Sequence, residues 1–207
     1  VNALVASVGA SGTVSVPTFG DYFQGENAAW DPDHSPSRMG KISECVRCWP
    51  GARRSFHAIH PVSAVGPRAA DLVVPDHETD FDTSSPFQRL IDWNAQILLL
   101  GVDWNVCTLL HAAEERQEVR YPRWVERKGQ QVEGGKTVDH RYQFLERYPG
   151  VRNDFLSFGK AREARGSVTV AEIGNASCLH DEAMAAVASD PLTLVHQATR
   201  STAKQYM

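Results

Sequence analysis

The sequence predicts an α/β fold: a mostly parallel central sheet with flanking helices and a small antiparallel C-terminal part. The apolar run Ile97–Leu100 is too short and uniform for an amphipathic helix and is typical of a strand buried on both faces. Val1–Val8 has a helical apolar stripe and leads into the strand-like Thr13–Pro17, as in the second half of a strand–helix–strand unit. Strands and helices alternate through most of the chain, the pattern of α/β proteins.

The remaining elements follow from apolar periodicity and from the turn residues at their ends. The segment Gly20–Gly40 is rich in Gly, Pro, Asp and Ser and predicts a long loop, and such loops are usually functional. A two-stranded antiparallel pair is expected at 119–125 and 131–138, with Gly134-Gly135 or Lys128-Gly129 as its turn. Helices are expected at 37–49, 67–74, 87–94, 142–148, 154–165, 179–189 and 190–197, and extended segments at 55–65 and 167–173.

The 207 residues are expected to form a single domain, with residues 119–165 as a possible subdomain on the side where a substrate would bind. The first half of the opening strand–helix–strand unit is missing, so this domain is predicted to be N-terminally incomplete. No apolar run approaches the ~20 residues that cross a bilayer, so no membrane association is expected. Four cysteines are too few for a disulfide scaffold, which indicates a reducing cytoplasm. The net charge of −4 argues against nucleic acid as a partner.

The segment after the apolar run carries the strongest chemical signal. Gly101 ends the run, and Asp103 or Asn105 can cap a helix that begins directly afterwards. On that helix a set of polar residues three and four positions apart shares one face: Thr108, His111, Glu114 and Glu115. An imidazole flanked by carboxylates is suited to act as a general base near neutral pH. The alternative is an ordinary helix, on which the imidazole packs and the carboxylates face water.

Four carboxylates alternate in the segment Asp76-His-Glu-Thr-Asp-Phe-Asp82. If the segment is extended, Asp76, Glu78, Asp80 and Asp82 line one face, which would suit a polycationic ligand. The alternative is a solvated acidic loop.

The pairs Cys45-x-x-Cys48 and His57-x-x-His60 have spacings found in zinc sites. However, both cysteines fall inside a predicted helix and near its end, where neither a zinc pair nor a redox pair is expected. No metal is therefore predicted.

Several separate motifs resemble the aminoglycoside 3-N-acetyltransferase family of antibiotic acetyltransferases. They keep the family's order and spacing over about residues 1–115, and the C-terminal half fits more loosely. The motifs are Val16-Pro-Thr-Phe19, Trp30-Asp-Pro-Asp-His-Ser-Pro-Ser-Arg-Met-Gly40, Pro50-Gly-Ala-Arg-Arg-Ser-Phe-His57, Pro61-Val-Ser-Ala-Val-Gly66, Ser84-Ser-Pro-Phe87, Leu98-Leu-Leu-Gly101 and Thr108-Leu-Leu-His-Ala-Ala-Glu114.

The resemblance implies acetyl-CoA as donor and the 3-amino group of an aminoglycoside as acceptor, with direct transfer and no acetylated side chain. It places the general base at His111, with Glu114 orienting the base and Thr108 beside the thioester. The residues expected to contact the coenzyme are His57, Val62, Ser63, Ala64, Ser85 and Phe87. The acidic segment, together with Trp30 and Asp31, is expected to hold the cationic substrate. The family's N-terminal strand and CoA-binding loop have no counterpart.

Two other functions remain open at this stage. One is a non-catalytic or vestigial relative that binds aminoglycosides, and the other is a zinc protein using Cys45, Cys48, His57 and His60. The expected ligand is an aminoglycoside or another small polyamine, and a homodimer is the one protein assembly considered.

Overall fold

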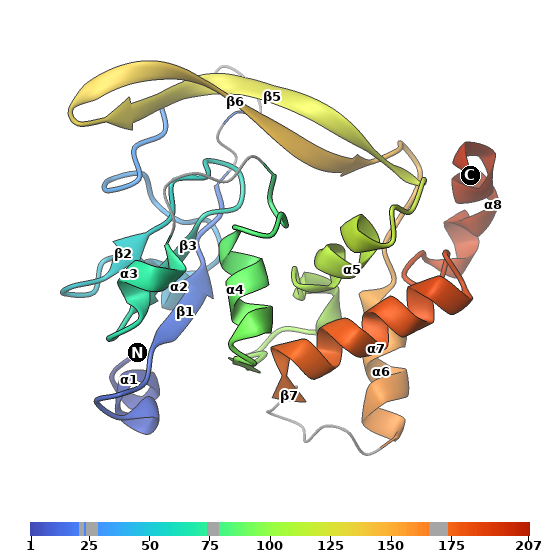
Figure 1. Ribbon diagram of the computed structural model, residues 1–207, viewed down its shortest axis with the longest axis horizontal. Helices are drawn as coiled ribbons and strands as arrows, with labels where there is room; N and C mark the ends of the chain where they lie inside the picture. Colours follow the sequence, from blue (N-terminus) through green and yellow to red (C-terminus); the bar gives the residue numbers. More distant parts are fainter. Residues whose placement is uncertain (21–22, 24–28, 74–78, 166–173) are drawn as a thin grey trace. The chain divides into compact units, whose positions relative to one another are not determined.

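The computed structural model describes residues 1–20, 23, 29–73, 79–165 and 174–207 (Figure 1). The chain divides into two compact units. The first contains residues 1–86 and 125–144, and the second contains residues 87–124 and 145–207. Among the described residues, no helix is long and apolar enough to cross a membrane.

The first unit is built on a three-stranded antiparallel sheet with the order β1–β3–β2. Strand β3 (Val62–Val65) is central, and each of its residues pairs with β1 (Val14–Pro17), in the register Val14 with Val65 and Pro17 with Val62. The short β2 (Arg53–Arg54) pairs with the other edge of β3. Three helices accompany the sheet: α1 (Asn2–Val8), α2 (Lys41–Arg47) and α3 (Ala69–Leu72).

Strands β5 (Pro122–Glu133) and β6 (Lys136–Arg147) form a long two-stranded ribbon, drawn in yellow in Figure 1. Gly134 and Gly135 connect them, with φ angles of 54° and 78°. Two successive residues with positive φ match the right-handed twist of a tight hairpin, and glycine adopts them without strain. The sequence left Gly134-Gly135 and Lys128-Gly129 open as the turn, and the structure has the first of them; the strand expected at 131–138 is wrong, because the turn falls inside it.

The second unit is mainly helical. Helix α5 (Leu110–Arg116) packs against α7 (Ala176–Ser189). Helix α6 (Phe155–Ala164) contacts the 3-10 turn η1 (Trp104–Val106), and Asp154 caps its start by accepting a hydrogen bond from the Ser157 amide. The other elements are α4 (Pro86–Asp92), the two-residue pair β4 (Gln96–Ile97) and β7 (Gly174–Asn175), η2 (Gln197–Thr199), α8 (Arg200–Ala203) and η3 (Lys204–Tyr206).

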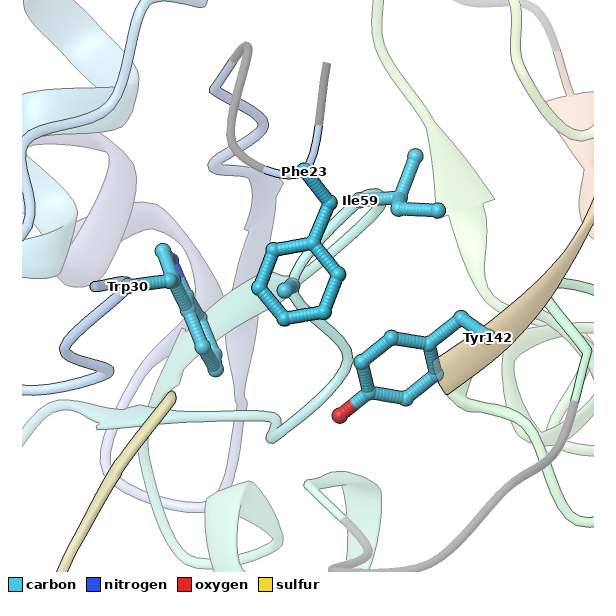
Figure 2. Packing of buried hydrophobic residues seen from close by; sticks show 5 residues of the cluster. Phe23, Trp30, Ile59 and Tyr142 are labelled. Atoms are coloured by element: carbon cyan, nitrogen blue, oxygen red, sulfur yellow. The ribbon is translucent and has the colours of Figure 1, made fainter. Parts of the chain in front are cut away.

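Each unit has its own apolar cluster. In the first, Phe23, Trp30, Ile59 and Tyr142 pack together, with Ala58 beside them (Figure 2). In the second, the buried members are Tyr121, Val151, Leu192, Val195 and Ala203. Trp30 and Tyr121 have no exposed surface, so both aromatic side chains are structural members of these clusters.

The prediction of a mostly parallel central sheet is wrong. The pairs β1–β3, β2–β3 and β4–β7 are antiparallel, β5 and β6 form a hairpin, and the parallel pairings among the described residues are two isolated bridges. The run expected to be the central strand contributes only Ile97 to a ladder, and Leu98 and Leu100 are 44% and 45% exposed. A short apolar run shows that burial is favourable, but it does not specify how the backbone is paired.

Several expected helices also differ from the structure. Residues 142–148 were expected to be helical and instead lie largely in β6, where the long ladder overrides a weak helical periodicity. The helix expected at 37–49 covers only Lys41–Arg47, and Met39 and Ile42 are exposed while Val46 is buried. The helix expected at 154–165 is present as α6.

Gly159 provides a test of packing in the second unit. A Cβ atom added there would lie 2.0 Å from ring atoms of Trp104, a buried residue whose indole N–H donates to Glu163. Gly159→Ala adds up to about 1 kcal/mol of helix propensity, but overpacking costs about 1–3 kcal/mol and should dominate. We expect urea denaturation to show a net loss of about 1 kcal/mol, whereas Ser157→Ala, an exposed position on the same helix, stays within about 0.5 kcal/mol. A Gly159→Ala variant as stable as the parent would contradict this packing.

Candidate active site

The segment before α5 shapes the approach to His111. Asp103 accepts a hydrogen bond from the Asn105 amide (2.9 Å) and caps η1. The prediction that Asp103 or Asn105 caps the helix of His111 is wrong, because α5 begins after Leu109 without a side-chain cap. A turn follows, in which the His111 amide donates to the Thr108 carbonyl, and α5 begins at Leu110. His111 therefore lies in the first turn of α5, and Glu114 lies one turn later on the same side.

Glu114 is the centre of a buried polar network. Its side chain is 1% exposed and receives three donors. His111 Nδ1 lies 2.6 Å from Oε2, while the Tyr121 hydroxyl and an Arg147 guanidinium N–H donate to Oε1 at 2.7 and 2.5 Å. A buried carboxylate is stable only when it is paired and hydrogen-bonded, and these three groups supply both conditions.

The network keeps Glu114 ionised. Burial alone would raise the pKa of Glu114, but the charge of Arg147, the charge of His111 when its ring is protonated, and the hydrogen bonds from His111 and Tyr121 lower it overall. Burial and the neighbouring Glu114 charge raise the pKa of Tyr121, so its hydroxyl remains a donor. An ionised carboxylate only accepts hydrogen bonds, so the proton between Glu114 and His111 belongs to Nδ1 of the imidazole.

This arrangement leaves the other ring nitrogen of His111, Nε2, as the basic atom of the neutral imidazole. The His111 side chain is 27% exposed, so solvent and ligands reach part of the ring. Phe155 packs edge-on against it, with ring centroids 4.8 Å apart. The same Phe155 ring carries the Arg147 guanidinium at 5.5 Å from its centroid. A base held at one nitrogen and partly accessible is suited to remove a proton from a bound amine.

The two other candidates near His111 have different surroundings. Thr108 is half-buried in the turn immediately before α5. Cys107 is buried, and burial raises the pKa of its thiol to about 12. A thiol that stays protonated is a poor nucleophile. The neighbourhood of His111 thus offers a base without an activated cysteine.

The residues expected to contact the coenzyme are largely covered. All six are buried, five of them in the first unit and Phe87 in the second. Ser63 lies on β3, with its hydroxyl 3.2 Å from the Thr18 hydroxyl. Their side chains serve the packing of their own units, and their role toward a coenzyme stays a prediction.

The acidic segment is only partly described, because Asp76 and Glu78 lie outside the described residues. Asp80 is 1% exposed, and its Oδ1 lies 3.1 Å from Nδ1 of both His57 and His60. Asp82 shapes a turn by accepting hydrogen bonds from the amides of Thr79 and Ser84. Asp80 and Asp82 therefore make intramolecular contacts in this structure.

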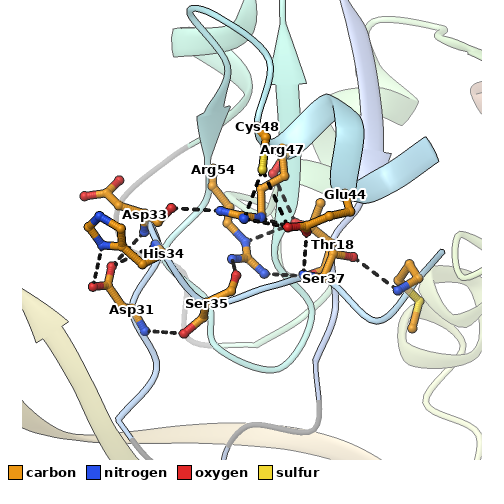
Figure 3. Close-up of polar contacts among 12 residues, drawn as sticks. Thr18, Asp31, Asp33, His34, Ser35, Ser37, Glu44, Arg47, Cys48 and Arg54 are labelled. Atoms are coloured by element: carbon orange, nitrogen blue, oxygen red, sulfur yellow. Dashed lines mark hydrogen bonds and ion pairs between the residues drawn. The ribbon is translucent and has the colours of Figure 1, made fainter. Parts of the chain in front are cut away.

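The loop that contains Trp30 and Asp31 is fixed from two sides (Figure 3). The buried Arg54 donates to the carbonyls of Thr18 and Ser35, and its guanidinium lies 5.4 Å from the centroid of the Trp30 ring. Asp31 Oδ2 lies 2.8 Å from His34 Nδ1. Trp30 is thus part of the core, whereas Asp31 lies on the loop, where its carboxylate contacts His34.

Helix α2 holds the other side of this loop. Glu44 accepts hydrogen bonds from Arg47 and from the Ser37 amide, and Arg47 donates to the Asp33 carbonyl (Figure 3). The hydrogen bond from Arg47 lowers the pKa of Glu44 to about 2. The loop conformation is therefore set by charged groups outside it.

No group of three or more His, Cys, Asp or Glu side chains could hold a metal ion within the described part of the chain. Cys45 and Cys48 are exposed at α2, and His57 and His60 face Asp80 instead. The structure thus provides no zinc cluster in these residues.

Sequence reasoning identified His111 and Glu114 but missed Tyr121, Arg147 and Phe155. These residues follow Glu114 by 7, 33 and 41 positions, and Arg147 reaches the network from the end of β6. The sequence analysis did not predict that Glu114 is buried, and that burial is the signal that would have called for additional donors, because a buried carboxylate requires them.

Similarity to known proteins identifies the family of this chain. Residues 1–190 match the family model for aminoglycoside 3-N-acetyltransferases, so the chain belongs to the aminoglycoside 3-N-acetyltransferase family. It is 31% identical to aminoglycoside N(3)-acetyltransferase IX of Micromonospora chalcea, over 80% of this chain and 71% of that protein. It is 34% identical to aminoglycoside N(3)-acetyltransferase VIII of Streptomyces fradiae, over 65% of this chain and 48% of that protein.

Solved structures show the same fold. The apoenzyme of aminoglycoside acetyltransferase AAC(3)-IVa superposes with a TM-score of 0.77 at 26% identity, over 100% of this chain and 82% of that one. AAC-VIa bound to sisomicin gives 0.76 at 23% identity, over 89% and 81% of the two chains. AAC-IIIb, solved as a binary complex with CoASH, gives 0.70 at 19% identity, over 86% and 77%.

Proposed function

We propose that this chain transfers an acetyl group from acetyl-CoA to the 3-amino group of an aminoglycoside, with His111 as general base. Family membership and the names of the relatives support acetyl transfer to aminoglycosides. The neighbours solved with sisomicin and with CoASH support the choice of the two substrates. The observation that carries the mechanism is the partly exposed imidazole bonded through Nδ1 to a buried, ionised Glu114.

In the proposed mechanism, His111 carries a proton from the attacking amine to the departing sulfur. An aminoglycoside amine is largely protonated near neutral pH, and it first releases one proton to solvent to become the neutral amine that attacks the thioester carbonyl. His111 accepts a second proton from this nitrogen at Nε2 as the new carbon–nitrogen bond forms, and the charge of Glu114 stabilises the resulting imidazolium. The imidazolium returns the proton to the departing sulfur when the carbon–sulfur bond breaks. The products are the N-acetylated sugar and free CoA thiol, and His111 is regenerated.

The remaining site roles complete the proposal. Thr108 lies in the turn before the base, and its proposed role is to contact the thioester through its hydroxyl. Asp31 and the acidic segment around Asp82 contribute negative charge for a polycationic acceptor. The coenzyme is held by the segment around His57 and Ser63 and by Ser85 and Phe87. Because these side chains are buried, backbone groups of those segments are the expected contacts.

The test combines protein, acetyl-CoA and sisomicin and measures free thiol. The exposed Cys45, Cys48 and Cys178 react with thiol reagents, so only thiol beyond this fixed background counts as turnover. We expect continuous release that requires all three components and is absent with a neutral oligosaccharide. Heat released on sisomicin binding without any thiol production would instead identify a non-catalytic binding protein.

A further inference from the structure

The Glu114 network contains a positive charge that general base catalysis does not by itself require. His111 and Arg147 are both able to carry positive charge, and both contact the same buried carboxylate. A carboxylate facing the imidazole alone would favour the imidazolium, because an opposite charge within about 4–6 Å stabilises the charged form. A base that is already protonated cannot accept the proton of an amine.

Arg147 changes this balance. Arginine stays protonated in proteins, so Glu114 and Arg147 together carry no net charge while the imidazole is neutral. Protonating His111 then adds a positive charge next to a guanidinium that shares its acceptor. We propose that Arg147 is a positioning residue that acts through Glu114 as a counter-charge and keeps the His111 imidazole unprotonated at neutral pH. This inference rests on the proposed function only where it predicts an effect on the rate of acetyl transfer.

The placement of Arg147 supports this role. Its side chain is 18% exposed, and the guanidinium lies over the Phe155 ring, whose edge packs against His111. Arg147 is the last residue of β6, so a strand end fixes its backbone. The counter-charge and the base thus contact one carboxylate and one aromatic ring, which fixes their separation.

The groups around the base come from four elements. Glu114 is on α5 with His111, Arg147 is on β6, Tyr121 follows α5, and the uncharged Phe155 is on α6. Helix α7 also packs on α5: its His180 lies near Asp181 and also senses the charge of Arg116 at the end of α5, and its Glu182 binds Arg162. Arg147 is therefore the cation that the described contacts place on Glu114 besides His111.

Tyr121 provides a matched comparison. It donates to the same Oε1 atom as Arg147, but as a neutral hydroxyl. Tyr121→Phe removes one hydrogen bond and no charge, whereas Arg147→Gln removes a charge as well. If the charge matters, the two variants must differ.

The experiment follows the His111 imidazole by NMR as pH is varied, which requires no turnover. Arg147→Gln should raise the titration midpoint by about one pH unit or more, and Arg147→Lys should leave it near the parent value. Glu114→Gln should lower the midpoint, and the double variant Glu114→Gln with Arg147→Gln should bring it back toward the parent. Arg123→Gln, at an exposed pair with Glu146, serves as the control for loss of an arginine charge that is bound to another carboxylate.

The same variants separate this inference from the proposed function. If the chain is an active acetyltransferase, the acid limb of its pH–rate profile moves upward with the imidazole midpoint in Arg147→Gln. If no variant has activity but the midpoints shift as expected, the proposed function fails and the counter-charge stands. An unchanged midpoint in Arg147→Gln, or equal shifts in Arg147→Gln and Tyr121→Phe, overturns it. If Arg147→Gln does not fold, the double variant Glu114→Gln with Arg147→Gln takes its place. A His111 titration midpoint in that double variant equal to the midpoint in Glu114→Gln alone also overturns the inference.

Discussion

His111→Ala is expected to reduce kcat/KM for acetyl transfer by about 100- to 10,000-fold, the range typical for loss of a positioned general base. The variant loses the only ring nitrogen bonded to the ionised Glu114. The attacking amine must then pass its proton to water. Continuous thiol release with sisomicin measures the rate, and thermal unfolding confirms that the variant is folded.

Two controls test whether the loss of rate is specific to the His111 imidazole. His196→Ala removes an imidazole of the second unit that accepts a hydrogen bond from the Ala198 amide, and its rate should stay within a few-fold of the parent. Added imidazole should restore part of the rate in His111→Ala only. Full activity in His111→Ala would exclude His111 as the general base.

Glu114→Gln is expected to lower the free energy of unfolding by about 3 kcal/mol near neutral pH. Removing one partner of a buried ion pair costs about 3–5 kcal/mol because the other charge remains uncompensated. The lower end of this range applies, since the Arg147 side chain is 18% exposed and keeps some access to water. Urea denaturation measures the change, and Glu118→Gln at an exposed position should change stability by about 0.5 kcal/mol or less.

The same substitution changes how stability depends on pH. The pKa of Glu114 is lowered in the folded chain from an ordinary value of 4.5. Its contribution is therefore fully present above about 4.5 and is lost as the pH falls through the lower folded value. Between those limits the parent should lose stability more steeply than Glu114→Gln. Equal slopes in the two proteins would show that Glu114 is not the titrating group.

The local elements of this fold could be predicted more reliably than its sheets. Helix α6 follows from the helical periodicity of residues 154–165, and the hairpin turn is one of two turns that adjacent residues suggested, because these signals act over a few residues. Strand pairing depends on partners far along the chain, so Ile97–Leu100 gave no information about its neighbours. The strand β6 was mistaken for a helix at residues 142–148 for the same reason.

In the candidate site, too, contacts between residues close in sequence could be predicted and contacts between distant residues could not. The spacing of His111 and Glu114 on one helix was sufficient to predict their proximity, and the structure places their polar atoms 2.6 Å apart. Their catalytic roles stay predictions. Arg147 could not be found from spacing, since it reaches Glu114 across 33 residues and through a hairpin. Asp80 could not be separated from its acidic neighbours until its burial against His57 and His60 was visible.

The anchoring of the loop by Arg54 bears on how this protein could acquire a different ligand preference. Arg47 and Arg54 bind the carbonyl oxygens of Asp33 and Ser35, which every amino acid possesses, so these hydrogen bonds do not depend on the side chains at those two positions. Asp33 and His34 are exposed on that frame. Substitutions at these two positions can therefore alter the charge and shape offered to a ligand while the path of the main chain stays the same.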